Sequence, residues 1–304
     1  MEYTVKNFAE EVADKVSEMM GEDFHVEINP VDKNNGIVLQ GLNIRKAGVN
    51  ICPCIYLDRY FEEYKRGGMG LHEIAEDVIA VYKENDGACD FDITRFTNFA
   101  NARTNLRCRL VNTERNSKLL SESPHREYLD LSLLYFVEYP DCQNGLASIR
   151  VMNHHMKSWG VSEDELYQIA MENMKKADDG LFVNMAQMMA YTMDIEPCAE
   201  LEDCNCFMYV LTNERKLNGA VQILNDNMMK RVADKIGRDF AIIPSSLHEV
   251  LIIPMSSRRE EEEFYTELKD MVKQVNDTAV SDTEILSYSV YRYDGESGEI
   301  EIAA

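Results

Sequence analysis

Hydrophobic positions in the first ninety residues follow a helical period, then a strand period, then a helical period again. Phe8, Val12, Val16 and Met19 share one helical face; Asn7 with Glu10 fits a capping box, and Gly21 ends the helix. Alternating stretches at 24–28, 37–45 and 49–57, separated by turns at 34–36 and 47–48, predict three strands. Helical spacing returns around Tyr60 and Tyr64 and again over 71–81. This opening region therefore predicts the order α-β-β-β-α.

The middle of the chain mixes short elements with polar stretches. Residues 91–101 predict a short helix, 106–111 a strand, and 112–126 a polar loop. The apolar run 129–137 predicts a strand that pairs with 146–151 across a turn at 141–145. Ser162 and Glu165 form a capping box for a helix that extends to about Lys176. The Met-rich residues 181–193 fit neither period and stay unassigned.

The last hundred residues show a more regular alternation of patterns. Strand patterns at 204–211, 240–243, 250–253, 286–293 and 299–302 are interleaved with helical patterns at 220–236 and after Ser257, which with Glu260 fits a cap. The order β-α-β-β-α-β is that of a ferredoxin-like unit. We predict an α+β fold in which antiparallel or mixed sheets pack against helices, with a ferredoxin-like arrangement in the C-terminal half.

The length of 304 residues suits two domains or one large domain. Neither an internal repeat nor a low-complexity linker marks a boundary. The most suitable division follows the strand pair of the middle region, near residues 160–180. We therefore predict an N-terminal α+β subdomain over residues 1–160 and a C-terminal α+β subdomain over residues 161–304.

The formal net charge is −23, and this sign opposes binding to nucleic acid or to anionic membranes. A high negative charge serves solubility, and mimicry of nucleic acid is the alternative interpretation. The first fifteen residues lack the pattern of a signal peptide, and no run of about 18 apolar residues occurs. We expect a cytoplasmic protein without a membrane segment, whose 8 cysteines are reduced.

Positive charge is concentrated in residues 93–159, which hold 9 Lys and Arg against 6 Asp and Glu. Arg103, Arg107 and Arg109 lie close together, and the last two share one face of a predicted strand. These arginines are candidates for binding an anionic ligand or an acidic partner. Alternatively, they neutralise acidic helices of the same chain.

A hydroxyl, an imidazole and a carboxylate occur together at Ser245, Ser246, His248 and Glu249. A nucleophile with an adjacent base is the catalytic interpretation of this segment. The members of a catalytic triad usually come from distant parts of a chain, whereas serine and proline between two strands are typical of turns. Both interpretations stay open at this point.

Two C-x-C pairs, Cys52 with Cys54 and Cys204 with Cys206, could each present two thiolates to one metal ion. Zinc knuckles usually space their cysteines by two residues, so buried thiols are the alternative. We predict no cofactor. The high methionine count of 17 suits either core filling or an adaptable surface for a partner.

Several short segments resemble a bacterial family catalogued as domain of unknown function 5688. They are GLNI at 41–44, CIYL at 54–57 followed by Tyr60 and Tyr64, LTN at 211–213 with Gly219 and Ala220, and above all IPSSLHEV at 243–250. The resemblance covers roughly residues 5–295. It implies an intracellular protein of gut-type anaerobes, often encoded near mobile elements, and it implies no reaction or catalytic residue.

The sequence favours a non-enzymatic cytoplasmic protein that binds another macromolecule, with an unidentified protein as its partner. The uneven charge and the Met-rich stretch support association. A hydrolase that uses Ser245 or Ser246 with His248 and Glu249 is one alternative, and an acidic mimic of nucleic acid is the other.

Overall fold

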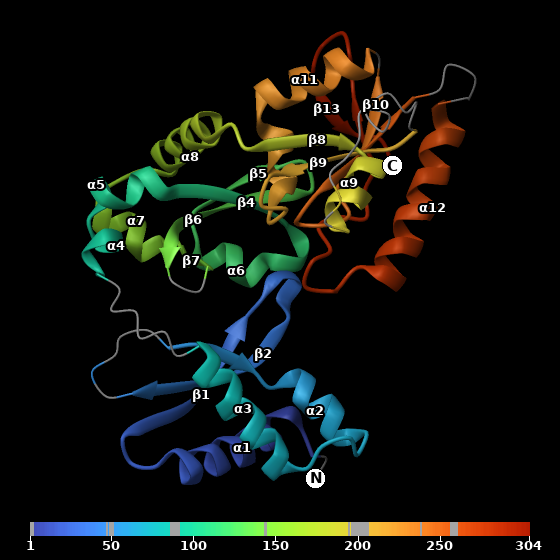
Figure 1. Ribbon diagram of the computed structural model, residues 1–304. Helices are drawn as coiled ribbons and strands as arrows, with labels where there is room; N and C mark the ends of the chain where they lie inside the picture. Colours follow the sequence, from blue (N-terminus) through green and yellow to red (C-terminus); the bar gives the residue numbers. More distant parts are fainter. Residues whose placement is uncertain are drawn as a thin grey trace. The chain divides into compact units, whose positions relative to one another are not determined.

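A computed structural model describes residues 3–46, 48, 52–85, 92–142, 145–193, 195, 207–237, 239–255 and 261–304. These residues form two compact units (Figure 1). The first unit comprises Met1–Thr97 and Tyr139–Ser148, and the second comprises Asn98–Glu138 and Ile149–Ala304. In the described ranges, every helix is too short or too polar to cross a membrane.

The two units do not follow the boundary predicted near residue 160. Residues 98–138 pack with the C-terminal part of the chain, because helix α8 (Glu163–Ala177) lies against strand β4 (Leu106–Asn112). The side-chain amide of Asn173 on α8 donates to the carbonyl oxygens of Arg103 and Leu106. The subdomains 1–160 and 161–304 stay a prediction about which parts fold independently.

The first unit has the predicted order α-β-β-β-α. Its antiparallel sheet has the order β1-β2-β3 and consists of β1 (Phe24–Asp32), β2 (Val38–Lys46) and β3 (Cys54–Tyr56). Its helices are α1 (Val5–Met20), α2 (Asp58–Lys65), α3 (Leu71–Asn85) and α4 (Thr94–Thr97), and the 3-10 helix η1 spans Asn34–Gly36. Phe8, Val12 and Val16 of the expected helical face of α1 lie in a core with β2, β3 and α3, whereas Met19, expected on the same face, is exposed.

The cap of α1 differs from the prediction by one turn. The side chain of Thr4 accepts a hydrogen bond from the backbone N–H of Asn7, and Asn7 accepts one from the backbone N–H of Thr4 in return. Thr4 is therefore the N-cap, and Asn7 occupies the third helical position that the sequence pattern assigned to Glu10. The predicted cap at Ser257 and Glu260 lies outside the described residues.

The second unit contains a six-stranded antiparallel sheet with the order β13-β12-β10-β11-β9-β8. Its strands are β8 (Gly180–Asn184), β9 (Tyr209–Asn213), β10 (Phe240–Ile243), β11 (Val250–Pro254), β12 (Tyr291–Tyr293) and β13 (Ile300–Ile302). Around it lie α9 (Met185–Thr192), α11 (Asp226–Ile236), α12 (Glu261–Ala279) and the 3-10 helix η4 (Gly219–Leu224).

The sheet corrects the expected ferredoxin-like arrangement. The order β9-α11-β10-β11-α12-β12 along the chain is the predicted one, and β10 with β11 forms the predicted hairpin. In a ferredoxin-like sheet the fourth strand of this unit lies beside the first. Here β12 pairs with β10, and β8 occupies the position beside β9. The α+β class is confirmed, with antiparallel sheets packed against helices.

Alternation along the central strands assigns a face of the sheet to each long helix. Ala241 and Ile243 on β10 pack against Phe264, Leu268 and Val272 of α12. Neighbouring positions of β10 point to the opposite side of the sheet. There Phe240 stacks on Tyr293 with ring centroids 4.5 Å apart, and Tyr293 shares a hollow with residues of α11. The two helices therefore cover opposite faces.

A smaller antiparallel sheet has the order β4-β6-β5, with β7 also paired to β6. It consists of β4, β5 (His125–Tyr128), β6 (Leu131–Cys142) and β7 (Gly145–Arg150). The short helices nearby in the chain are α5 (Phe99–Ala102), η2 (Arg103–Asn105), η3 (Glu114–Asn116), α6 (Ser117–Glu122) and α7 (Asn153–Trp159).

The structure corrects two local predictions in the second unit and assigns a third segment. Residues 112–126, expected to be a loop, contain η3, α6 and the start of β5. The expected helix over 220–236 is divided by the cap Asn225 into η4 and α11. The unassigned Met-rich stretch holds the end of β8 and helix α9, which begins at the capping box of Asn184 and Gln187.

The turn between β5 and β6 is connected to β12 by a set of hydroxyl hydrogen bonds. The carboxylate of Asp130 accepts hydrogen bonds from the hydroxyls of Tyr291, Ser287 and Ser289. The side chain of Tyr291 is fully buried. Burial, followed by the charge of Asp130, raises the pKa of this phenol well above its usual range. Tyr291 therefore remains a donor at neutral pH.

We predict that Asp130→Ala lowers the free energy of unfolding by about 2 kcal/mol, since buried donors lose their acceptor. Asp130→Asn retains one acceptor oxygen and should cost less. Urea denaturation followed through the fluorescence of Trp159 would measure both changes. Equal stability of Asp130→Ala and the unsubstituted protein would show that this carboxylate does not stabilise the unit.

Candidate functional site

The segment 244–249 connects β10 to β11, and backbone hydrogen bonds pair it with residues 284–287. The N–H groups of Leu286 and Ser287 donate to the carbonyls of Ser245 and Pro244, and the N–H of Leu247 donates to the carbonyl of Glu284. Ser245 and Ser246 are buried, with exposed fractions of 9% and 7%. The segment is thus an integral part of the sheet region, although it carries no strand of its own.

Ser246 and His248 are close, but their side chains do not face each other as a nucleophile and its base would. The hydroxyl oxygen of Ser246 accepts a hydrogen bond from the backbone N–H of His248 at 3.0 Å. This is the local turn bond that serine often forms with the backbone two residues later. The imidazole of His248 instead accepts the backbone N–H of Asn218 at Nδ1, 3.2 Å away.

His248 anchors the loop that follows β9. Its carbonyl oxygen accepts the hydroxyl of Thr212 at 2.7 Å and the N–H of Gly219 at 2.9 Å. Because Nδ1 is an acceptor, the proton of the neutral ring lies on Nε2, which is 3.6 Å from a carboxylate oxygen of Glu284. The imidazole thus links the β10–β11 connection to the loop that follows β9, which is a structural role.

Glu249 is half-buried, and desolvation raises the pKa of its carboxyl group, as does the nearby Glu284. The adjacent His248 acts in the opposite direction. Three hollows on the described part of the chain, including the two along α11 considered below, are lined by residues other than 244–249.

The three candidate arginines, Arg103, Arg107 and Arg109, lie in different environments. Arg109 forms an ion pair with Glu138 at 2.7 Å and lies over the ring of Phe136. The guanidinium of Arg107 donates to the carbonyl oxygens of Thr104 and Leu106. Arg103 is exposed on η2. Arg109 thus neutralises a carboxylate of its own chain.

Cys52 and Cys54 are half-buried free thiols near and on β3. Burial raises the pKa of both thiols, which disfavours the thiolate that a metal ion requires. Among the described residues, no group of three or more His, Cys, Asp or Glu side chains is arranged to hold a metal ion. Cys204 and Cys206 lie outside the described residues.

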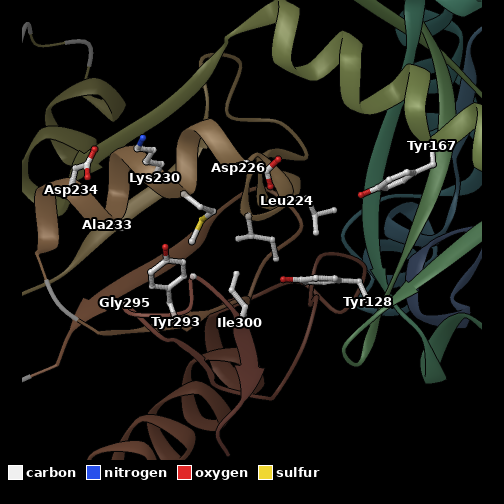
Figure 2. A pocket seen from close by; sticks show the side chains of 13 residues that line it. Tyr128, Tyr167, Leu224, Asp226, Lys230, Ala233, Asp234, Tyr293, Gly295 and Ile300 are labelled. Carbon is white, nitrogen blue, oxygen red and sulfur yellow. The ribbon is translucent and has the colours of Figure 1, made fainter.

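A hollow of about 500 Å³ lies along one side of α11 (Figure 2). Asp226, Lys230 and Asp234 of α11 form one side, and Tyr293, Gly298 and Ile300 of the β12–β13 hairpin form another. Tyr128 from β5 and Tyr167 from α8 close one end, with their hydroxyls pointing inward (Figure 2). A second hollow of about 470 Å³ shares Ala233, Asp234 and Gly295 with the first. We call the two together the α11 groove.

The aromatic walls of the α11 groove are fixed by contacts behind them. The guanidinium of Arg126 lies 4.0 Å from the ring centroid of Tyr167 and binds Glu163 through two nitrogens at 3.1 and 2.7 Å. On the other side the ring of Tyr293 stacks on Phe240. Side chains held in this way lose little conformational entropy when a ligand contacts them.

The polar groups of the α11 groove comprise both charges and neutral donors. Asp226 forms an ion pair with Lys175 at 2.9 Å, whereas Lys230 has no ion-pair partner within the described ranges. Burial raises the pKa of Tyr128 to about 12, so its hydroxyl remains protonated at neutral pH. The groove therefore combines hydroxyl donors with aliphatic and aromatic surface.

The sequence predicted none of these groove residues as a site. The apolar face of α11 was visible as a helical pattern, but it is the face that enters the core. In the sequence, the face of α11 that lines the groove is marked only by the charged residues Asp226, Lys230 and Asp234, spaced four apart. The same spacing is typical of an ordinary solvent-exposed helix. Tyr128, Tyr167 and Tyr293 are far apart in the chain, and only the tertiary structure brings them to one hollow.

Gly219 provides the first test of the His248 contact. A Cβ atom at this position would lie 2.7 Å from the carbonyl oxygen of His248 and 2.6 Å from the amide nitrogen of Asn213. We predict that Gly219→Ala costs about 1–3 kcal/mol of stability, because backbone atoms must shift. Gly180→Ala is the control, since its closest contact is the flexible side chain of Met228. Equal losses in urea denaturation would contradict this assignment.

Glu249 allows a test by pH. Its carboxyl group has a raised pKa in the folded state, so ionisation at neutral pH opposes folding, and this penalty disappears as the pH falls below the unfolded pKa. We predict that Glu249→Gln stabilises the protein at neutral pH and that the gain vanishes in acid. Thermal denaturation across this range would measure it. A gain that persists at low pH would show that ionisation is not the cause.

Comparison with known proteins adds a family but no activity. No curated protein and no solved structure gives a significant match to the chain. The model of a family of unknown function, DUF5688, matches residues 5–295. This range includes the segment 243–250, the loop at 211–220 and the residues of α11 that line the groove. It excludes Gly298 and Ile300 of the β12–β13 hairpin. By this match over nearly its whole length, the chain belongs to the DUF5688 family.

Proposed function

We propose that this protein is a non-enzymatic cytoplasmic protein that binds a segment of a partner protein in the α11 groove. The observation that carries this proposal is the pair of adjoining hollows along α11, with three tyrosines and several aliphatic side chains in their walls. An elongated groove suits an extended polypeptide segment, whose successive side chains can occupy neighbouring hollows.

The composition of the groove supports recognition of side chains with a large hydrophobic surface. Tyrosine supplies contact area and a hydrogen bond with only two rotatable bonds, and it is enriched at the centres of protein interfaces. Leu224, Met229 and Ile300 add aliphatic surface beside the rings. We infer that an aromatic or aliphatic residue of the partner occupies the hollow between Tyr128, Tyr167 and Ile300.

A hydrolase that uses the 245–249 segment receives less support. The hydroxyl of Ser246 accepts from the chain itself, and the imidazole of His248 accepts from Asn218. A substrate would have to displace these contacts in a region whose serines are nearly inaccessible. Mimicry of nucleic acid and an association with mobile elements stay predictions.

A cytoplasmic location is supported by the thiols. Cys52, Cys54 and Cys108 are free, and burial raises the pKa of each. For Cys108 the value rises to about 12. Neutral, protected thiols of this kind suit a reducing compartment.

We predict that display of a random peptide library selects peptides rich in aromatic and aliphatic residues that bind the α11 groove. Tyr167→Ala should weaken their binding about tenfold, since it removes a fixed aromatic wall. Tyr191→Ala is the matched control, because Tyr191 is exposed on α9 and lies outside the groove. Fluorescence anisotropy with labelled peptides would measure the dissociation constants.

Two results would decide against the proposal. Peptides that bind Tyr167→Ala as tightly as the unsubstituted protein would place the binding surface elsewhere. Hydrolysis of an activated ester such as p-nitrophenyl acetate that disappears in both Ser246→Ala and His248→Ala would favour the enzyme instead, provided that both variants remain folded by circular dichroism.

A further inference from the structure

The strand β13 forms one edge of the six-stranded sheet and pairs only with β12 in the described part of the chain. The direction of its backbone groups follows from the hydrogen bonds at either end of the β12–β13 ladder. Asp294 donates its N–H to the carbonyl of Glu299, and Ala303 donates to that of Val290. Hydrogen-bonded pairs alternate in an antiparallel ladder, so Glu301 is the next residue bonded to β12.

The intervening residues, Ile300 and Ile302, therefore direct their N–H and C=O groups away from β12. No described residue forms a hydrogen bond with these backbone groups. The side chain of Ile302 is 47% exposed, and Ile300 lines the α11 groove with Tyr128 and Tyr167 (Figure 2). An open sheet edge and the hollow thus meet at Ile300.

The charge around this edge is strongly negative. The guanidinium of Arg292 on β12 lies within 4 Å of carboxylate oxygens of Asp239, Glu261, Asp294 and Glu301. One cation faces four carboxylates, and Glu296 and Glu299 are exposed nearby in the hairpin. An added strand that carries lysine or arginine would reduce the mutual repulsion of these carboxylates.

Building on the proposed function, we propose that the partner segment is a basic, extended peptide that adds to β13 as a seventh strand. Its backbone pairs with the outward groups of Ile300 and Ile302, as in other complexes formed by strand addition. Because side chains alternate between the faces of a strand, those on the α11 side enter the groove. The remaining side chains present their positive charge to the carboxylates near Arg292.

The test uses a capped synthetic peptide of about ten residues in which lysine alternates with valine and tyrosine. We expect it to bind the full-length protein, with weaker binding at higher ionic strength. N-methylation of every second amide on the edge that faces β13 should weaken binding about tenfold or more, because each lost hydrogen bond contributes. A peptide with glutamate in place of lysine should not bind.

Variants of the protein separate this inference from the proposed function. Ile302→Pro removes one outward N–H and leaves the bonds of Glu301 to β12 in place, so binding should weaken about tenfold. If Tyr167→Ala weakens binding but Ile302→Pro and N-methylation do not, the groove binds peptides without strand addition. If the lysine peptide does not bind at all, the basic strand is wrong, whereas library peptides sensitive to Tyr167→Ala would still support the groove.

Discussion

The hydrogen bonds that converge on Asp130 determine the geometry of the α11 groove. Asp130 lies two positions after Tyr128. Its carboxylate accepts hydrogen bonds from the hydroxyls of Ser287 and Ser289, which precede β12, and of Tyr291, the first residue of β12. Tyr128 lies at one end of the groove, and Tyr293 and Ile300 form the side that the β12–β13 hairpin contributes. The distance between Tyr128 and the β12–β13 hairpin therefore depends on hydrogen bonds between two sheets. Hydrogen bonds are directional, so they fix the relative orientation of the two sheets more closely than an apolar contact would.

The same part of the molecule concentrates three features that are costly for an isolated protein. It has a strand edge that no described residue pairs with, an aromatic hollow and a group of carboxylates around the guanidinium of Arg292. Proteins usually protect an open edge by charge, by short length or by covering it. The edge β13 is short and acidic, which opposes pairing with a second copy of this acidic chain and favours a basic partner.

The His248 segment shows how a cluster in sequence can differ from a cluster in function. Serine, histidine and glutamate within six residues indicate catalysis only if their side chains converge on a substrate. Here the hydroxyl of Ser246 and the imidazole of His248 both accept hydrogen bonds from backbone N–H groups. The carbonyl oxygen of His248 accepts hydrogen bonds from the hydroxyl of Thr212 and the N–H of Gly219. The segment 243–250 therefore serves as the connection between β10 and β11 that also contacts β9 and η4.

The sequence by itself determined the local elements, because period and capping depend on neighbouring residues. It predicted α1 with its apolar face, the hairpin β10–β11 and the start of α8 at Ser162. It could not predict that β12 pairs with β10 instead of lying beside β9, since strand order depends on packing between distant segments. Likewise, Tyr128, Tyr167 and Tyr293 carry no common signal along the chain. Only the tertiary structure decided that they share a hollow, because the hydrogen bonds of Asp130 join segments more than 150 residues apart.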